Sequence, residues 1–345
     1  MNAAQTSLTK RLRLSSNPSL QRRYMVVAEP VRANLRVGPL LEELDKVAEA
    51  IGLRYVHQTW PNARVVTAAV DDLRVIAPPD ITQDMLLRAR INFVGRTSME
   101  VGVRLEQPGN PSVHIGTCYF TMVARITDET GEHSAPLPPL EYPTAKDKAR
   151  AERAVQRREA ARRSQTQEHP TPEEYAMLHS LHERVDHPNG PLLLARDLTT
   201  SGWERTYPEH ENVPQKIFGG YVIHRAYMYS HICAEMVADF RPLLVSSDRI
   251  DFYQPVRMGD KLHFLSRVTY TGETSITVET TITRISRDRT MTALSNACIF
   301  TFVNVDADLN QMPVPQLYPT TYSEDARYLA GYRRHQQYLV RRKSS

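Results

Sequence analysis

Two short segments carry residues that could act on a carbonyl group. Residues 209–220 read EHENVPQKIFGG, and Gly219 and Gly220 would open a helix. Unpaired backbone N–H groups at a helix N-terminus can hold an oxyanion, and glycine lets a ligand approach the backbone closely. Asn212, just upstream, has an amide that can orient water or a carbonyl. An ordinary loop and turn before a helix would explain the same residues.

The matching place earlier in the chain is Arg36-Val-Gly38, with Asp45 following two turns later. Seven residues at about 3.6 per turn bring Gly38 and Asp45 to one helix face. A carboxylate on the packing surface of such an apolar helix would be desolvated and would gain basicity. Asp45 could instead face solvent, as Glu42 and Glu43 are expected to do, and the pattern alone does not decide.

Other potentially reactive side chains fit structural roles better. Three cysteines sit in apolar runs and are expected in the core. A group of histidines lacks a known metal-ligand spacing and is expected at the surface. These residues are Cys118, Cys233 and Cys298, and His179, His182, Glu183 and His187. The sequence has no GxSxG, GxGxxG, GxxxxGK[ST] or HExxH motif, which disfavours serine hydrolases of that type, dinucleotide folds, P-loops and zincins.

Composition limits the class of protein. The chain has 345 residues, enough for roughly two domains of about 150 residues. Three cysteines without a CxxC pair exclude a disulfide framework and a cysteine zinc cluster. The apolar runs are far short of the roughly 18 residues of a membrane span. A formal net charge of +4 tolerates an anionic ligand but does not argue for nucleic acid.

The first 28 residues are basic and rich in serine, with no acid before Glu29. Such a composition is typical of a mitochondrial transit segment, and an ordinary frayed basic terminus explains it equally well. No secretory hydrophobic region is present, so export is not expected. A transit segment would place the protein in the mitochondrial matrix, with a cytoplasmic location as the alternative.

A second basic block covers residues 144–164 and holds eight cations against three acids. Its alanine, arginine and glutamate content favours a helix. Few apolar residues mark a buried face, so we expect a solvated helix that joins two domains. Nucleic-acid binding is the weaker alternative, because no aromatic residues interleave with the charges to stack bases.

The chain contains an internal repeat. Residues 71–78 (DDLRVIAP) resemble 248–255 (DRIDFYQP), and residues 95–101 (GRTSMEV) resemble 272–278 (GETSITV), both at an offset of 177. Residues 120–123 and 300–303 match at an offset of 180. Three matches in order at nearly one offset indicate two copies of one domain.

Each copy has the same order of expected elements. A helix comes first, at 39–52 and at 221–240. Two strands around a tight turn follow, within 87–105 and 262–285. A last strand covers about 115–126 and 293–305. A long helix followed by antiparallel strands predicts an α+β domain with the helix packed on the sheet, and the two sheets could pair edge to edge.

Several segments together resemble the mitochondrial acyl-coenzyme A thioesterase 9 family, whose members are built as double hotdogs. The resemblance runs from about Asn17 to His335. Four segments carry it: RVGPLLEELD (36–45), VGRTSMEV (94–101), the stretch 212–220 ending in IFGG, and YPTTYSEDARYLAGYRRH (318–335), of which the second and the last are distinctive. The chain departs from the family pattern after the glycines, where Ile223 and His224 replace a Met-Arg pair.

The resemblance implies a tandem hotdog fold, in which each antiparallel sheet wraps around a long central helix. It also implies hydrolysis of fatty acyl-CoA to free acid and CoA, and assembly into homotrimers. Asn212 of the second domain would face Asp45 of the first, with Asp45 as general base or nucleophile. The opposite site would be inactive, because Tyr227 and Pro30 stand where an acid and an asparagine would be.

Further roles follow from the same resemblance. The N–H of Gly219 or Gly220 would stabilise the oxyanion, and Glu49 would help to orient water. Arg96 and Phe218 would bind the substrate. No metal or separate cofactor is expected, because a thioester is already activated.

The sequence predicts five regions. They are a basic N-terminal segment (1–28), a first hotdog domain (29–130), a Pro-rich and basic helical linker (131–192), a second hotdog domain (193–306) and a C-terminal tail (307–345). A hotdog hydratase would need a histidine five residues after Asp45 or Asp71, and neither has one. A non-catalytic acyl-CoA binder or scaffold of the same fold is the other alternative.

Overall fold

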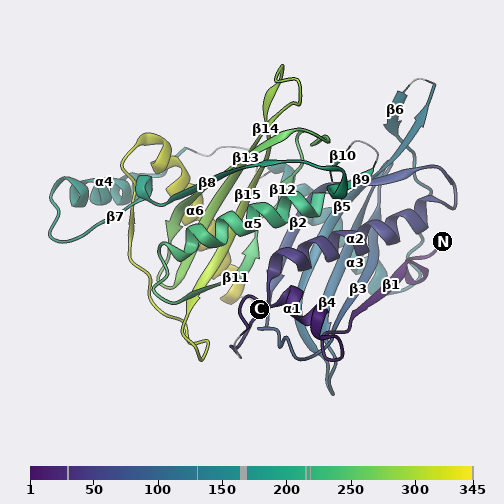
Figure 1. The fold of residues 1–345 in the computed structure, drawn as a ribbon, viewed down its shortest axis with the longest axis horizontal. Coiled ribbons are helices and arrows are strands. Elements are labelled where there is room, and N and C mark those ends of the chain that lie inside the picture. The colour runs from purple at the N-terminus through teal and green to yellow at the C-terminus, as the bar shows by residue number, and fades with distance from the viewer. Residues whose placement is uncertain (29–30, 130, 164–168, 214–215, 218, 344–345) are drawn as a thin grey trace.

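The computed structural model describes residues 1–345 except 29–30, 130, 164–168, 214–215, 218 and 344–345. Two units of similar architecture lie side by side (Figure 1). The first contains η1 (Ala3–Gln5), β1 (Ser7–Leu12), α1 (Pro18–Tyr24), α2 (Val37–Val56), β2 (Arg64–Val75), β3 (Met85–Val94), β4 (Ser98–Gln107), β5 (Val113–Asp128), β6 (Gly131–Ser134) and α3 (Ala145–Arg163).

The second unit follows α4 (Pro172–Asp186) and repeats this order. It contains β7 (Leu193–Leu194), η2 (Ala195–Asp197), β8 (Thr199–Arg205), η3 (Pro208–His210), β9 (Glu211–Val213), β10 (Lys216–Ile217), α5 (Gly219–Glu235), β11 (Arg241–Ser247), β12 (Ile250–Asp251), β13 (Lys261–Thr271), β14 (Ser275–Ile285), β15 (Thr292–Val305), β16 (Leu317–Tyr318) and α6 (Tyr322–Lys343).

The strands of the two units form one continuous antiparallel sheet. The first unit has the order β1-β3-β4-β5-β2, and the second has the equivalent order β8-β13-β14-β15-β11. The halves join where β11 pairs with β2, and β12 also pairs with β2. The expected edge-to-edge pairing and the tandem α+β architecture are therefore confirmed.

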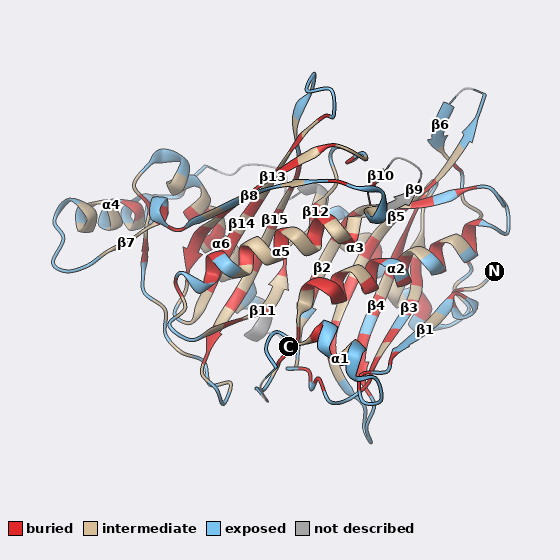
Figure 2. Cartoon of the chain, viewed as in Figure 1, coloured by how far each residue is buried: buried red, intermediate tan, exposed pale blue. Residues whose placement is uncertain are grey.

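The central helices α2 and α5 pack against each other on one face of this sheet (Figures 1 and 2). On α2 the predicted apolar positions Leu40, Leu44, Val47 and Ile51 are all buried. Each such side chain contributes roughly 1.5–3 kcal/mol on burial. The helices approach closely at Gly38, where an added Cβ would lie 2.0 Å from His224 Cδ2.

The first 28 residues are part of the folded unit, so the expectation of a frayed terminus is wrong. β1 pairs with β3 over its whole length, and Leu12 and Leu14 are buried. The basic side chains have acidic partners, since Lys10 pairs with Glu43, and Arg11 lies 2.6 Å from Asp84. β8 occupies the equivalent edge of the second unit.

The sequence predicted that the basic helix α3 is a solvated helix between two domains, and this prediction is wrong. It packs on the face of the sheet opposite α2, with Ala151 and Ala154 buried. Arg157 donates to Glu100, and its guanidinium lies 3.7 Å from the centroid of the Tyr119 ring. Alanine leaves room for close approach while long arginines reach the sheet, a mode of docking that hydrophobic periodicity does not show.

The C-terminal region is likewise more than a tail, because α6 covers the same face of the second unit. Gly331 packs against Tyr270, and Arg334 lies 2.5 Å from Asp248. α3 and α6 begin at residues 145 and 322, which are 177 residues apart, the offset of the internal repeat. The repeat therefore extends to these outer helices.

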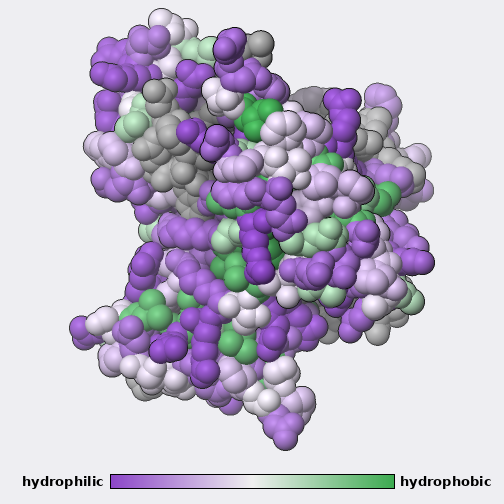
Figure 3. Space-filling model, turned by 90° about the vertical axis from the view of Figure 1, so that its right-hand side faces the viewer, coloured by the Kyte–Doolittle hydropathy of each residue, from purple (hydrophilic) through white to green (hydrophobic). Residues whose placement is uncertain are grey.

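The surface at the end of the molecule formed by the first unit is mostly hydrophilic. Figure 3 shows hydrophobic side chains gathered there in small patches between charged ones. Among the described helices, none combines the length and the apolar character that crossing a membrane requires.

Candidate active site

Asp45 lies two turns into α2 and faces the N-terminus of α5. Only 1% of its surface is exposed, so the alternative in which it faces solvent is wrong. Its Oδ1 accepts a hydrogen bond from Thr67 Oγ1 at 2.5 Å. Its Oδ2 accepts one from the backbone N–H of Gly220 at 2.7 Å. The first unit thus supplies a carboxylate that is held against the helix N-terminus of the second.

Burial raises the pKa of Asp45 to about 6, while the hydrogen bonds from Thr67 and Gly220 act in the opposite direction. The carboxylate is therefore mostly ionised at neutral pH and more basic than an ordinary aspartate. A group with a pKa near the working pH is well suited to accept a proton from water.

Glycine is needed at the start of α5. A Cβ on Gly219 would lie 3.1 Å from Phe252 Cζ and 3.4 Å from Asp45 Oδ2, so a side chain would crowd the carboxylate. The first N–H groups and the dipole of this helix end favour negative charge. The Gly220 N–H, expected as an oxyanion donor, is bonded to Asp45 in this structure.

An irregularity in β2 shapes the other wall of the site. The pairing of β2 with β5 shifts between Thr67 and Ala69, as at a β-bulge. The carbonyl of Ala68 accepts from the N–H of Phe252, which follows β12. Bulges often re-aim side chains next to active sites. Thr67 and Phe252 were not predicted from sequence, because threonine and phenylalanine are ordinary in strands.

The other predicted site residues lie on several different elements, and the structure does not describe the side chains of all of them. Asn212 is in β9, on the short β9–β10 ribbon that leads into α5, but its side chain lies outside the described residues, as do Phe218 and Pro30. Glu49 is half-buried one turn beyond Asp45. Arg96 lies in the turn between β3 and β4 with its side chain exposed, and its carbonyl accepts from Leu137.

The two central helices correspond at an offset of 182, which pairs Gly38 with Gly220 and Asp45 with Tyr227. Tyr227 is buried, and its ring packs against Phe300 and Phe302. The position equivalent to Asp45 thus holds an apolar cluster in place of a carboxylate.

Between the helices, His224 Nδ1 lies 2.6 Å from Glu42 Oε1. This contact lowers the pKa of Glu42 although burial acts to raise it. Glu42 and His224 are equivalent positions at the same offset of 182, so the pair bridges the two helices near their pseudo-twofold axis. The expectation that Glu42 and Glu43 simply face solvent is wrong.

The cysteines and histidines set aside above have structural surroundings. All three cysteines are buried, and burial raises the pKa of Cys233 to about 11. His182 lies 2.8 Å from Asp325, and His179 is an exposed neighbour of Glu183. Within the part of the chain that the structure describes, no group of three or more potential ligands could hold a metal ion.

Comparisons with known proteins agree with this architecture. A thioesterase superfamily model matches residues 217–291. The chain is 28% identical to mitochondrial acyl-coenzyme A thioesterase 9 of Homo sapiens, over 93% of this chain and 75% of that protein. It is 34% identical to protein VdlD of Helicobacter pylori, over 39% of this chain and 76% of that protein.

Among solved structures, an acyl-CoA hydrolase from Staphylococcus aureus in complex with butyryl coenzyme A and coenzyme A matches with a TM-score of 0.42. It is 24% identical and covers 45% of this chain and 94% of that one. Together with the tandem sheet and the paired central helices, the sequence matches show that the chain belongs to the acyl-coenzyme A thioesterase 9 family of double hotdog proteins.

Proposed function

We propose that this protein is an acyl-CoA thioesterase that hydrolyses fatty acyl-CoA to a free fatty acid and CoA. The observation that carries the proposal is the buried Asp45 carboxylate, bonded to the Gly220 N–H at the start of α5. The names of the relatives support the reaction, since they are acyl-CoA thioesterases.

The chemistry follows from a basic carboxylate beside a helix N-terminus. Asp45 accepts a proton from water as the water oxygen bonds to the thioester carbon. The carbonyl π electrons move to oxygen, and the N–H of Gly219 and the dipole of α5 stabilise that oxyanion. When the carbonyl re-forms, the C–S bond breaks, and the CoA sulfur takes up the proton and leaves as a thiol.

Direct attack by Asp45 is the second route. Its carboxylate oxygen would bond to the thioester carbon, CoA thiolate would leave, and water would then hydrolyse the resulting anhydride. After a single turnover in ¹⁸O-labelled water, label in Asp45 would establish direct attack. The general-base route places ¹⁸O directly in the fatty acid, whereas hydrolysis at the acyl carbon of the aspartyl group leaves it in the protein.

The supporting roles rest on the family resemblance. Asn212 would position the water or the thioester carbonyl, and Glu49 would help to orient water. Arg96 would contact the CoA phosphates, and Phe218 would line the acyl site. No metal is required by this chemistry, because the thioester carbonyl is already electrophilic. Tyr227 at the equivalent position of the second helix supports one active site per chain.

Thiol release from acyl-CoAs of increasing chain length tests the proposal. The wild type should turn over at least one of them, and Asp45→Asn should lose on the order of 10²-fold or more in rate. Asp186→Asn, at the exposed end of α4, is the control and should keep full activity. Binding of acyl-CoA without turnover would favour a non-catalytic binder, and turnover that survives Asp45→Asn would remove Asp45 from the mechanism.

We also propose that the chain assembles as a homotrimer and acts in the mitochondrial matrix. The family resemblance supports the trimer, and the mitochondrial names of several relatives support the location. Light scattering on the purified protein would give the molecular mass of the assembly. Fractionation of cells that express the full chain would locate it.

A further inference from the structure

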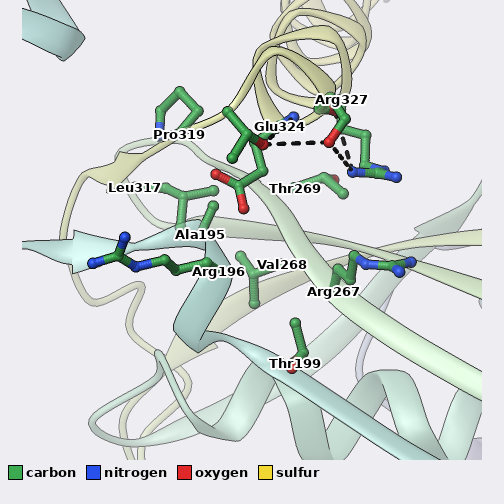
Figure 4. A pocket seen from close by; sticks show the side chains of 12 residues that line it. Ala195, Arg196, Thr199, Arg267, Val268, Thr269, Leu317, Pro319, Glu324 and Arg327 are labelled. Atoms are coloured by element: carbon green, nitrogen blue, oxygen red, sulfur yellow. Dashed lines mark hydrogen bonds between the residues drawn. The ribbon is translucent and has the colours of Figure 1, made fainter.

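A cavity of about 350 Å³ lies beneath the N-terminal end of α6, on the side of the sheet away from α5. β13 forms its floor, and η2 and the start of β8 form its far wall (Figure 4). Arg267 points into it from β13, and Arg327 and Glu324 border it from α6. In Figure 4 the guanidinium groups of Arg267 and Arg327 lie on one side, while the Glu324 carboxylate lies toward Ala195 and Leu317.

The first unit has the same pattern of residues, but there a carboxylate of the protein contacts the arginines. At the repeat offset of 177, Arg267, Glu324 and Arg327 correspond to Arg90, Asp147 and Arg150. Asp147 is almost fully buried, and its Oδ1 forms an ion pair with Arg90 and lies 3.5 Å from Nη1 of Arg150. A carboxylate of the protein thus sits between two arginines.

In the second unit the acid equivalent to Asp147 does not take this place. Glu324 is directed to the preceding turn instead, where its Oε2 accepts from the N–H of Thr320 at 2.7 Å and from its hydroxyl at 2.9 Å. Glu279, the cross-strand partner of Arg267 in the β13–β14 ladder, lies 3.4 Å from Arg327 and also acts electrostatically on Arg267. The Arg267 side chain forms no hydrogen bond or ion pair with any residue that the structure describes.

This arrangement leaves Arg267 as a partly buried charged group. Its side chain is half-buried, and burial together with the nearby Arg327 lowers its pKa below the usual range for arginine, although Glu279 acts in the opposite direction. A partly desolvated guanidinium without an acceptor is unfavourable, and an anion placed beside it would relieve that cost.

We propose that this cavity binds a small phosphate-bearing molecule, whose anionic group lies between Arg267 and Arg327 as the Asp147 carboxylate lies between Arg90 and Arg150. Guanidinium groups match phosphate oxygens with two parallel hydrogen bonds. Thr199 and Thr269 add hydroxyl groups to the wall. The volume is at the lower end of the range for ligand pockets, about 300–1,000 Å³.

The site is separate from Asp45, because the sheet stands between them. Ser266 and Val268 are buried on the face that carries α5, so Arg267 between them projects from the opposite face. A ligand in this cavity would therefore act on the protein without competing for the catalytic carboxylate. The phosphates could belong to CoA or to a free nucleotide.

Isothermal titration of the full chain at low salt tests the proposal, with sodium pyrophosphate as the first probe. Arg267→Gln should weaken binding at least tenfold. Thr199→Glu, which places a carboxylate directly across from Arg267 in the β8–β13 ladder, should also abolish binding by filling the site. Arg54→Gln, on the exposed side of α2, should bind as the wild type does.

Titration with ADP and with CoA then identifies the source of the phosphates. A probe that uses this cavity should lose affinity in both Arg267→Gln and Thr199→Glu, whereas binding of CoA at the active site should survive in both variants. Equal affinity of pyrophosphate for the wild type and Arg267→Gln, or no binding to the wild type, would overturn the proposal. Circular dichroism of each variant verifies that it is folded.

Discussion

Asp45 of the first unit and Gly220 of the second share a hydrogen bond of 2.7 Å, which crosses between the two central helices. Neither unit holds both partners, so the candidate site exists only where the units meet. Covalent linkage of the two copies in one chain guarantees that meeting. It also allows the equivalent position, Tyr227, to become part of the core.

The pH dependence of turnover should report the raised pKa of Asp45. The ionised form is the base, so kcat/KM of the wild type should rise with pH through about 6 and then level off. Initial rates between pH 4.5 and 8 with one acyl-CoA would show this. A profile that rises near pH 4 would mean that the essential carboxylate is an ordinary exposed one.

The stability of the protein should depend on pH through the raised pKa of Asp45. The folded pKa of Asp45 is about 6 against an ordinary 3.8, so the folded state binds the proton more tightly between these values. Ionising the buried carboxyl therefore destabilises the folded state, an effect that is nearly absent below pH 4 and complete above pH 6. At about 1.4 kcal/mol per pKa unit, it lowers the unfolding free energy by about 3 kcal/mol.

Asp45→Asn removes this titration. The stability difference between the variant and the wild type should therefore shift in favour of the variant by about 2.5 kcal/mol between pH 4 and pH 7. Urea unfolding at both pH values measures it, and any constant loss from altered hydrogen bonds cancels in the comparison. A difference that does not change with pH would contradict the buried titration.

The hydroxyl of Thr67 should lower the pKa of Asp45. Thr67→Val removes the hydroxyl that donates to Asp45, and that hydrogen bond lowers the pKa of the carboxyl. The midpoint of the pH–rate profile should move above 6, so that activity falls several-fold at pH 7 and recovers toward pH 8. Thr67→Ser keeps the hydroxyl and should restore the midpoint. An unchanged midpoint in Thr67→Val would mean that the hydroxyl does not act on Asp45.

The overall fold could be predicted from the sequence because its signals are periodic and repeated. Gly95-Arg-Thr-Ser and Gly272-Glu-Thr-Ser mark the turns of both central hairpins, and the apolar spacing of residues 39–52 marks α2. The outer layer could not be predicted in this way. α3 docks through alanines and arginines, and its burial depends on a sheet face that no local pattern reveals.

Only part of the candidate site could be predicted from the sequence. Gly38 and Asp45 could be placed on one face of a helix by spacing alone, but whether that face met solvent depended on the position of α5. Thr67 and Phe252 reach the site through a bulge and a strand crossing between units. Such contacts arise from tertiary register, for which a single sequence carries no local signal.

Close packing of the helices should make Gly38 intolerant of a side chain. In Gly38→Ala the new Cβ would overlap His224, so α2 and α5 would have to separate, at a cost of about 1–3 kcal/mol. Adding His224→Ala should relieve the overlap. A double-mutant cycle by urea unfolding should then show that the double variant is more stable than the sum of the single changes. Additive losses would mean that the two residues do not share this contact.

The two copies of the arginine–carboxylate cluster should respond differently to loss of their acid. Asp147 is buried between Arg90 and Arg150 and also accepts from Thr144 at 2.7 Å, so Asp147→Asn should lower the unfolding free energy by about 2–4 kcal/mol. Glu324 instead accepts from Thr320, and a glutamine can keep one of those hydrogen bonds. Glu324→Gln should therefore cost less than about 1 kcal/mol.

Urea unfolding of the two variants under one set of conditions makes this comparison. Because α3 and α6 begin one repeat apart, each variant is the other's matched control for position on the outer helix. A large loss in Asp147→Asn alone would mean that only the first unit uses the acid of its outer helix to neutralise the two arginines. Equal losses would mean that Glu324 pairs with Arg267 in solution, and the cavity beneath α6 would then be closed as its counterpart is.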